Sequence, residues 1–477
     1  MKTGETEREK TPLLKETNSS NGSKFGYKYF LLLLVMVFLY ISVGITFYTI
    51  SQWIQYKVRK EILQGIEINS TSVCEGTNQS DPVYEKFQTV EKKTAFWQML
   101  NQLASSIPGS LAVLIIPSFS DSLGRKVLFV LPTTTILLKE VIYALIIYFE
   151  WDILWVVLAS LFEGIFGSFY LFRSGMYAYI ADITKPGRHR TLALTILEGS
   201  FLIFITLSGL AAGYFIEFEG FLVPMITCVG LIFFAWCIVI FALPETHEKH
   251  NRAKKMPFGD HMKRITGFYR SKQFSNKRSA YVMLLLAFFI AELTSSHRTS
   301  LEMLYQLGKP FCWPSQKIGL FSAARHATEG FAGLVLIAPL KSCFSEIIIA
   351  ILSSMFNAGS YVLEAFADTD LILYLVPIPA TFSFLMIPMI KTMMSSMTPS
   401  DKQGSLFSGI VFVEVLCSIT ATYLFNTIYS VTLSLFHGLV FLVLAGLCIL
   451  VLIVLILFAM TQTVEIALPK LEKIVTN

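Results

Sequence analysis

The chain has 477 residues, of which 54% are hydrophobic and only 15% are charged. Soluble domains usually carry about 25% charged residues, so this composition excludes an ordinary soluble protein and indicates lipid as the surrounding solvent. The net charge of +5 does not indicate a nucleic-acid partner, because the basic residues gather in particular loops, as they do in membrane proteins.

Long apolar runs predict helices that span a membrane, because about 20 apolar residues cross the hydrocarbon core as a helix that satisfies its own backbone groups. The first run begins near residue 28 and is too long for the apolar part of a cleaved signal peptide. The sequence predicts twelve spans, at 28–50, 94–119, 127–149, 153–180, 191–215, 221–243, 279–304, 316–339, 346–367, 371–392, 405–427 and 434–460.

A polar, basic segment separates the sixth and seventh spans and divides the chain into two bundles of six helices. We therefore predict an all-α membrane protein with an N-terminal bundle (28–243) and a C-terminal bundle (279–460). A linker (244–278) joins the two bundles, and tails at 1–27 and 461–477 flank them.

The Lys and Arg residues of the loops predict the orientation. Basic residues at Arg125, Lys126, 185–190, Lys341 and Lys402 fall in loops on one side, whereas the short loops on the other side are acidic. Because loops rich in Lys and Arg stay in the cytosol, both termini and the linker are predicted to be cytosolic. The loop at 51–93 then faces the exterior or the lumen of an organelle.

The predicted outer loop carries two glycosylation sequons, at Asn69 and Asn78. Cys74 of this loop and Cys312, between spans seven and eight, are the two cysteines that fall clearly on the oxidising side. Two possibilities follow: a disulfide that ties the two bundles together at the outer face, or two unpaired thiols.

The loop between spans two and three reads Asp121-Ser122-Leu123-Gly124-Arg125-Lys126. Gly124 permits a tight turn, and Asp121 and Arg125 can pair with each other or with a helix end. At this loop of a six-plus-six chain, the segment resembles the cytosolic-loop signature of the major facilitator superfamily, and such a cluster can act in gating. An ordinary basic loop is the alternative.

Further segments resemble solute carrier family 46, which contains the proton-coupled folate transporter and its lysosomal relatives. The most specific is the outer loop at 304–313 (LYQLGKPFCW), and the others are 179–182 (YIAD), 197–200 (LEGS), 403–408 (QGSLFS) and 425–429 (FNTIY). The resemblance runs from the first span to the last. It implies a major facilitator fold, inward movement of a solute coupled to protons, and a disulfide between the two bundles.

Ionisable side chains inside the predicted spans are the main functional candidates, because each is costly in hydrocarbon unless it faces water or a partner. They are Lys139, Glu140, Glu163, Arg173, Glu198, Glu292, His297, Arg298, Arg325, His326, Glu329, Glu364, Lys391, Glu414 and His437. So many intramembrane charges favour a transport pathway over a passive anchor.

Glu198 is the first candidate for proton coupling. It lies about eight residues, or ~12 Å, into span five, at a depth similar to that of Arg173 on span four. It also matches the span-five glutamate that the family ties to proton coupling. A structural ion pair with Arg173, itself a candidate for binding the substrate, is the alternative. Asp182 matches the family's Ala-Asp at the end of span four and is predicted as a gate or a structural cap.

Arg325, His326, His297 and Glu292 are predicted to form a titratable, cationic pocket for an anion in the C-terminal bundle. Histidine changes its charge between pH 5 and 8, which suits a carrier driven by a pH gradient. His326 falls at the family's span-eight histidine, whereas His297 is displaced from the family's span-seven histidine. Each of these residues could instead be structural.

Two departures from the folate transporter affect the predicted substrate. Arg325 stands where that transporter has glutamine, and Lys391 stands where it has arginine. A lysine keeps the charge but lacks the planar fork of arginine, and Lys391 could also be a snorkelling interfacial lysine. A strict assignment to folate therefore does not follow.

Glu9, Leu13 and Leu14 of the N-terminal tail form an acidic dileucine pattern of the kind that sorting adaptors read on cytosolic tails. The pattern predicts an adaptor complex as a partner and an endosomal or lysosomal membrane as the location. The plasma membrane is the alternative.

The sequence contains no nucleotide-binding phosphate loop, no Cys/His set with metal-ligand spacing and no soluble domain large enough for catalysis. We therefore predict a carrier and not an enzyme, without cofactor or metal, driven by a proton gradient. The expected activity is symport of a small organic anion (folate-like, a muropeptide or a cyclic dinucleotide) into the cytosol by a monomer, with an oligomer left open. A proton-independent uniporter or exchanger and a non-transporting receptor or scaffold are the alternatives.

Overall fold

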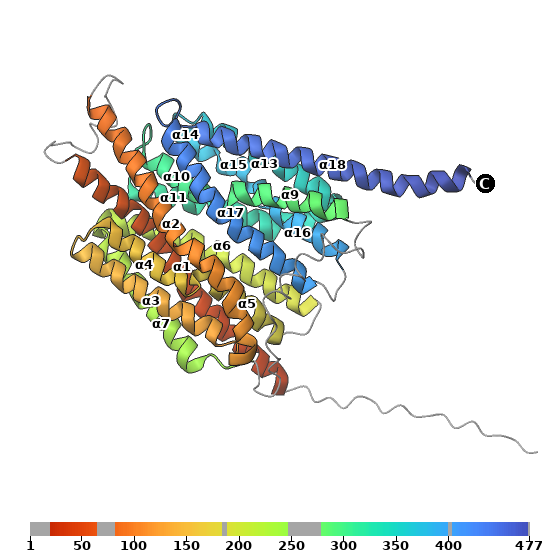
Figure 1. Ribbon diagram of the computed structural model, residues 1–477, viewed down its shortest axis with the longest axis horizontal. Coiled ribbons are helices and arrows are strands. Elements are labelled where there is room, and N and C mark those ends of the chain that lie inside the picture. Colours follow the sequence, from red (N-terminus) through yellow and green to blue (C-terminus); the bar gives the residue numbers. More distant parts are fainter. Residues whose placement is uncertain (1–19, 64–81, 184–187, 247–277, 399–402, 476–477) are drawn as a thin grey trace, which may run out of the picture.

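The computed structural model describes residues 20–63, 82–183, 188–246, 278–398 and 403–475. Over these ranges the chain is helical, with short connections and no β-strand. Figure 1 shows the helices packed side by side, with the N-terminal helices (red to yellow-green) beside the C-terminal helices (green to blue).

Each predicted span corresponds to one helix or to a run of consecutive short helices. The N-terminal half contains α1 (Ser20–Ile62), α2 (Pro82–Leu123), α3 (Val127–Tyr148), α4 (Ile153–Ile165) with α5 (Ser168–Ile183), α6 (Arg188–Glu219), and α7 (Leu222–Cys237) with η1 (Ile238–Ala242). The C-terminal half contains α9 (Arg278–Ser295) with α10 (Arg298–Leu307), α11 (Ser315–Phe331) with η4 (Ala332–Leu336) and α12 (Ile337–Cys343), α13 (Glu346–Ala365), α14 (Asp370–Leu375) with α15 (Pro377–Ser383) and α16 (Met386–Met397), α17 (Gln403–Thr432) and α18 (Leu439–Val475).

Nine of these segments, counted within the described ranges, are long and apolar enough to cross a membrane. The others are α2, α6 and the α11–α12 segment, and they pack against helices of the opposite half, α6 against α11 and α2 against α17. Their polar or small side chains include Gln98 and Asn101 on α2, Gly209 on α6 and Arg325 on α11. Such side chains suit contact with protein better than contact with lipid.

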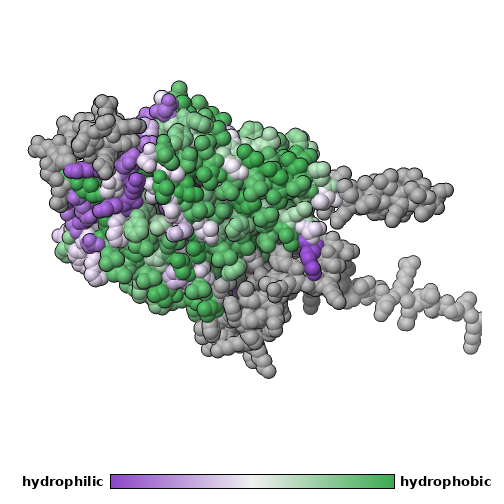
Figure 2. All heavy atoms as spheres, turned by 45° about the horizontal axis from the view of Figure 1, so that its top comes forward, coloured by the Kyte–Doolittle hydropathy of each residue, from purple (hydrophilic) through white to green (hydrophobic). Residues whose placement is uncertain are grey.

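Apolar side chains cover the flank of the helix bundle. Figure 2 shows hydrophobic residues over the flank, most of the hydrophilic residues at one end and a smaller hydrophilic group at the other. Leu111, Ile226, Phe234 and Phe241 are among the large apolar side chains that are exposed. An apolar surface of this extent is unusual for a protein in water and is expected for helices surrounded by lipid.

Among the described residues, the two halves share an apolar core at one end of the bundle and have separate cores at the other. We name this end, which holds the loop between α10 and α11, the outer face, because the sequence predicts that it faces the exterior or a lumen. Here Tyr48 of the N-terminal half packs in one cluster with Phe321 and Tyr429 of the C-terminal half. At the opposite end each half has its own core, around Phe129 in one and Met389 in the other. The structure is therefore closed at the outer face.

Glycines bring α6 and α11 into close contact within this shared region. A Cβ atom on Gly319 would lie only 2.5 Å from the carbonyl oxygen of Gly209. Nearby, the hydroxyl groups of Tyr48 and Ser322 form a hydrogen bond between the halves. The closed outer face thus depends on the absence of side chains at these glycines.

Candidate functional site

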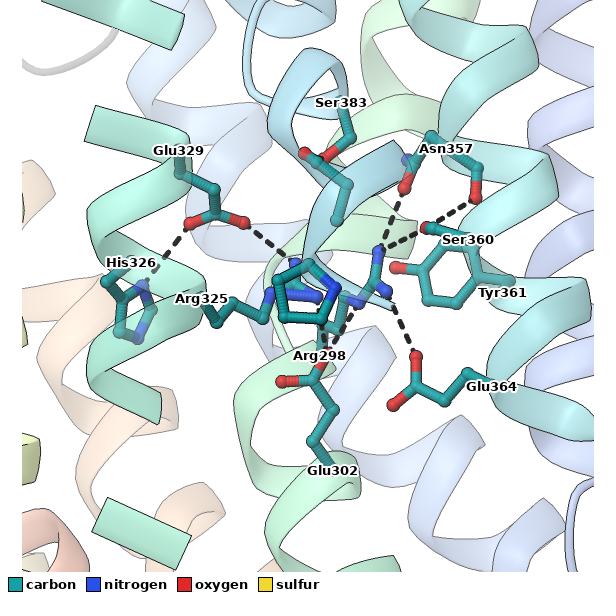
Figure 3. Close-up of polar contacts among 12 residues, drawn as sticks. Arg298, Glu302, Arg325, His326, Glu329, Asn357, Ser360, Tyr361, Glu364 and Ser383 are labelled. Atoms are coloured by element: carbon teal, nitrogen blue, oxygen red, sulfur yellow. Dashed lines mark hydrogen bonds and ion pairs between the residues drawn. The ribbon is translucent and has the colours of Figure 1, made fainter. Parts of the chain in front are cut away.

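A buried network of charged side chains lies within the C-terminal half (Figure 3). Span seven is interrupted here, because α9 ends at Ser295 and α10 begins at Arg298. The four-residue spacing puts Arg298 and Glu302 on one face of α10, where Arg298 Nε donates to Glu302 Oε1 at 2.7 Å. Arg298 is only 3% exposed, so its charge and its donors need partners within the protein.

Helix α13 supplies the remaining partners of Arg298. The guanidinium donates to Asn357 Oδ1 and Ser360 Oγ from Nη1 and to Glu364 Oε2 from Nη2, each at 3.0 Å. Its central carbon lies 4.0 Å from the ring centroid of Tyr361. A buried guanidinium is tolerated when its donors are used and its charge is compensated, and both conditions are met here.

Helix α11 adds a second arginine to the same network. Arg325 Nη1 donates to Glu302 Oε1 at 2.6 Å, and Arg325 Nη2 donates to Glu329 Oε1 at 2.7 Å. His326 Nδ1 lies 3.2 Å from the other carboxylate oxygen of Glu329. Glu302 therefore bridges two arginines and connects α10 with α11, while Arg298 connects α10 with α13 (Figure 3).

The charges of this network balance only if it also holds a proton. Arg298 and Arg325 carry two positive charges, whereas Glu302, Glu329 and Glu364 can carry three negative ones. Glu364 is fully buried, and its Oε1 has no hydrogen-bond partner among the described residues. Because an uncompensated charge is costly away from water, one of these carboxyl groups is suited to bind a proton as long as His326, beside Glu329, is neutral.

A second group of charged residues lies where the two halves face each other. Lys391 of α16 forms an ion pair with Glu414 of α17. Glu292 of α9 lies close enough to Lys391, to Glu414 and to Arg173 of α5 for their charges to act on it. Arg173 Nε also donates to the hydroxyl group of Tyr177 at 3.2 Å. All four charged side chains are partly exposed, whereas Arg298, Glu302 and Glu364 of the first network are buried.

The structure separates the four residues that the sequence predicts in one pocket. Arg325 and His326 belong to the buried network, and Glu292 lies in the charged group between the halves. His297 is buried against α17, where Asn426 Nδ2 donates to His297 Nε2 at 2.8 Å. The residues occupy three different environments, and their roles in binding and proton transfer stay predictions.

The N-terminal half has a buried charged group of its own. Lys139 Nζ of α3 lies 3.3 Å from Glu163 Oε2 of α4, and Ser105 of α2 donates to the same glutamate at 3.1 Å. Thr46 of α1 donates to Glu140 Oε2 of α3 at 2.6 Å. These contacts join four helices of the half, which indicates a structural role.

The predicted cytosolic-loop motif connects the loop between α2 and α3 with α5 and with the segment that follows η1. Gly124 has a φ of 111°, a conformation that favours glycine. The turn lets the backbone N–H groups of Arg125 and Lys126 donate to Glu245 at 2.8 and 3.1 Å, and Arg125 Nε donates to Asp182 Oδ2 at 3.1 Å. The sequence predicts Gly124, Arg125 and Asp182 for this site but not Glu245, which falls in the predicted linker.

Several predicted site residues lie outside what the structure describes. They are Glu9, Leu13, Leu14, Asn69, Cys74 and Asn78, together with the side chains of Asp121 and Glu198. Their sorting, glycosylation, proton-coupling and gating roles stay predictions. The free thiols of the described residues are Cys228, Cys237, Cys343, Cys417 and Cys448. Cys312 is not among them, and its pairing with Cys74 also stays a prediction.

Two important carboxylates are not predicted from the sequence. Glu302 joins both arginines of the buried network, and its spacing of four residues from Arg298 is the signal that could have found it. Glu91 falls in the predicted outer loop, where an acidic residue is expected to be solvated. In the structure Glu91 is buried and contacts the backbone of Lys309.

Known protein sequences are similar to this chain over most of its length. The family model described as Major Facilitator Superfamily matches residues 98–422. The lysosomal proton-coupled steroid conjugate and bile acid symporter SLC46A3 of Gallus gallus is 30% identical over 423 residues, which cover 87% of this chain and 90% of that protein. The Homo sapiens protein of the same name is 30% identical over 398 residues (80% and 83%). The proton-coupled folate transporter of Rattus norvegicus is 25% identical over 372 residues (78% and 80%).

Solved structures share the arrangement of helices. The human organic anion transporter MFSD10 (TETRAN) has a TM-score of 0.64 at 14% identity, with 90% of this chain and 99% of that chain covered. A POT family transporter in complex with 5-aminolevulinic acid has a TM-score of 0.59 at 13% identity, with 89% and 95% covered. At such identities the likeness concerns the fold alone.

Proposed function

We propose that this chain, which belongs to the major facilitator superfamily and within it to solute carrier family 46, is a proton-coupled symporter of an organic anion. The family and the fold class agree with the predictions from the sequence, and the family is one of membrane transporters and not of enzymes. Transport runs from an acidic lumen or exterior into the cytosol.

Proton coupling is supported above all by the surplus carboxylate of the buried network. With two arginines and three glutamates, the network is neutral only when one proton is bound. Glu364, with its unpartnered Oε1, is the first candidate to carry that proton, and Glu198 remains the predicted candidate of the N-terminal half. The relatives named as proton-coupled symporters and transporters support the same reading.

The charged group between the halves supports an anionic substrate. Arg173 from one half and Lys391 from the other present positive charge toward the same region. The relatives are named for steroid conjugates, bile acids and folate, which share an ionised acidic group on a ring system. We therefore propose an anion with a ring system as the substrate class.

The transport cycle is proposed to be alternating access by rocking of one half against the other. The closed outer face of the structure corresponds to the state that follows entry of the substrate from the outer side. The lysosomal membrane is the proposed location, with the dileucine pattern read by an adaptor complex and Asn69, Asn78 and the Cys74–Cys312 disulfide on the lumenal side.

The experiment is uptake into proteoliposomes with an acidic exterior and a neutral interior. The panel contains a bile acid, a steroid sulfate, folate, a muropeptide and a cyclic dinucleotide. Glu364→Gln is expected to abolish accumulation driven by the pH gradient while exchange of substrate for substrate, which moves no net proton, persists. Glu346→Gln, at the start of the same helix with a side chain that is 41% exposed, is the matched control and should behave as wild type.

The outcomes separate the proposal from its alternatives. Uptake by the wild-type protein that is independent of the proton gradient would indicate a uniporter or exchanger. Binding of a panel compound without any uptake, by protein whose insertion is verified, would indicate a receptor or scaffold.

A further inference from the structure

A buried carboxylate bridges the two halves at the outer face. Glu91 of α2 is only 8% exposed, and it accepts the backbone N–H of Lys309 at 3.0 Å. Lys309 lies in the loop between α10 and α11, so this hydrogen bond joins the N-terminal half to the C-terminal half. The loop approaches closely because residue 308 is glycine: a Cβ atom on Gly308 would lie 2.7 Å from Glu91 Oε1.

The carboxylate of Glu91 is poorly compensated in this closed arrangement. Its Oε2 is buried without a hydrogen-bond partner in the part of the chain that the structure describes. Burial raises the pKa of Glu91 to about 7, although the N–H group and the charge of Lys309 act in the opposite direction. Its ordinary value is 4.5, so the closed face binds a proton that a hydrated Glu91 releases.

Other charged and titratable groups surround this contact. Lys309 Nζ lies 6.0 Å from the ring centroid of Phe87, and the guanidinium carbon of Arg59 of α1 lies 5.7 Å from the same centroid. Tyr429 of α17 is close enough to Glu91, and His437 close enough to Lys309, for their charges to interact. The positive charge of Lys309 favours the ionised carboxylate, and burial, which is the larger effect, favours the protonated one.

We propose that Glu91 is a proton-binding site of the outer gate, and that this gate closes fully when Glu91 takes up a proton from the outer side. A protonated Glu91 still accepts the Lys309 N–H through Oε1, and the proton on Oε2 removes the uncompensated charge. When the halves part, Glu91 becomes hydrated and ionises. Acid at the outer side therefore drives closure, after which an inward-moving solute can no longer return to the outer side.

The role of Glu91 in solute movement rests on the proposed function, whereas closure of the outer gate can be measured without a substrate. Spin labels on Phe218→Cys and Leu371→Cys, at exposed positions near the outer ends of the two halves, report the distance across the gate. The full-length carrier in lipid nanodiscs, with the exposed Cys343 replaced by serine, is examined between pH 7.5 and 5.5. We take the ordinary pKa of 4.5 for Glu91 in the open state and a pKa of about 7 in the closed state. Linkage then predicts that the ratio of closed to open molecules rises about 20-fold over this range.

Three substitutions test the assignment to Glu91. Glu91→Gln, which imitates the protonated acid, is expected to hold the closed distance at every pH. Glu61→Gln, at an exposed position at the outer end of α1, is the matched control and should respond as wild type. Glu91→Asp keeps a titratable group and should keep a pH response with a shifted midpoint, which provides a test should the glutamine variant not fold.

The proposal is overturned if Glu91→Gln follows pH as the wild type does, or if the wild-type distance does not respond to pH. Failure of the proposed function has a different signature, because an absence of uptake for every anion leaves the gate measurement unchanged. Conversely, a gate that ignores pH leaves proton-driven uptake through Glu364 or Glu198 intact.

Discussion

Replacing Arg298 by methionine should release α13 from α10. The substitution keeps an unbranched side chain but removes the donor that Glu364, Asn357 and Ser360 share. Breaking a buried ion pair by removing one partner costs about 3–5 kcal/mol, and a desolvated cation–π contact such as that with Tyr361 contributes about 2 kcal/mol. Because these contacts share one guanidinium they are not additive, so the expected loss in the free energy of unfolding is about 3–5 kcal/mol.

The assay is reversible unfolding of the purified protein in mixed micelles with a rising fraction of sodium dodecyl sulfate. Adding Glu364→Gln to the Arg298→Met protein removes the carboxyl group that has lost its donor and should recover about 1–3 kcal/mol. Lys341→Met is the matched control, because Lys341 pairs with Glu346 at 3.4 Å with side chains that are 40% and 41% exposed. Exposed pairs contribute about 0–1 kcal/mol.

The reasoning fails if Arg298→Met unfolds within about 1 kcal/mol of wild type. It also fails if Glu364→Gln worsens the defect of the Arg298→Met protein, because the carboxylate would then have partners other than the arginine. A loss for Lys341→Met as large as that for Arg298→Met would show that removal of any lysine or arginine destabilises this protein in micelles.

Three further predictions concern other parts of the chain. Gly319→Val places a Cβ atom 2.5 Å from the carbonyl oxygen of Gly209. The variant should therefore fold but fail to close its outer face, and it should show no net uptake. Uptake at the wild-type rate would contradict the close packing of the two helices. Mass mapping without reductant should find a peptide that links Cys74 to Cys312, and Cys74→Ser should lower stability by about 2–4 kcal/mol; a free Cys312 thiol in the wild type excludes the disulfide. Replacing Leu13 and Leu14 by alanine should move the carrier to the cell surface, and unchanged lysosomal staining removes the sorting assignment.

The helices and their order could be predicted from the sequence because hydrocarbon leaves few alternatives. A backbone in lipid must satisfy its own hydrogen bonds, so apolar runs of sufficient length become helices whatever their neighbours are. The interruption of span seven could not be predicted in the same way. Nothing between Ser295 and Arg298 is a proline or glycine, and Arg298, the first residue after the break, contacts α13, which lies far along the chain.

The partners of the charged residues depend on which helix faces which, and periodicity along one helix does not determine this. The sequence shows that Arg325 and His326 are costly in hydrocarbon, but both arginines converge on Glu302 only when α10 and α11 lie side by side. Pairs within one helix, such as Arg325 and Glu329, are visible from their spacing. Pairs between helices need the packed structure.

The strongest described contacts lie within the halves. The Arg298 network connects α10, α11 and α13 of the C-terminal half, and the Lys139–Glu163 pair connects α3 with α4 of the N-terminal half. A rearrangement inside either half would break a buried ion pair, at a cost of about 3–5 kcal/mol. Each half is therefore expected to move as a unit.

Each contact between the halves is individually weaker than these buried ion pairs. Gln55 Nε2 donates to the carbonyl oxygen of Leu307 at 3.3 Å, and the hydroxyl groups of Tyr170 and Ser418 lie 3.3 Å apart. Neutral hydrogen bonds of this kind contribute about 0.5–1.5 kcal/mol each, so they can be exchanged for water when the halves part. Glu91 differs from them because its strength as an acceptor and its cost of burial both change with protonation. A carrier whose halves rock against each other can be made sensitive to pH at such a contact without any change in its interior.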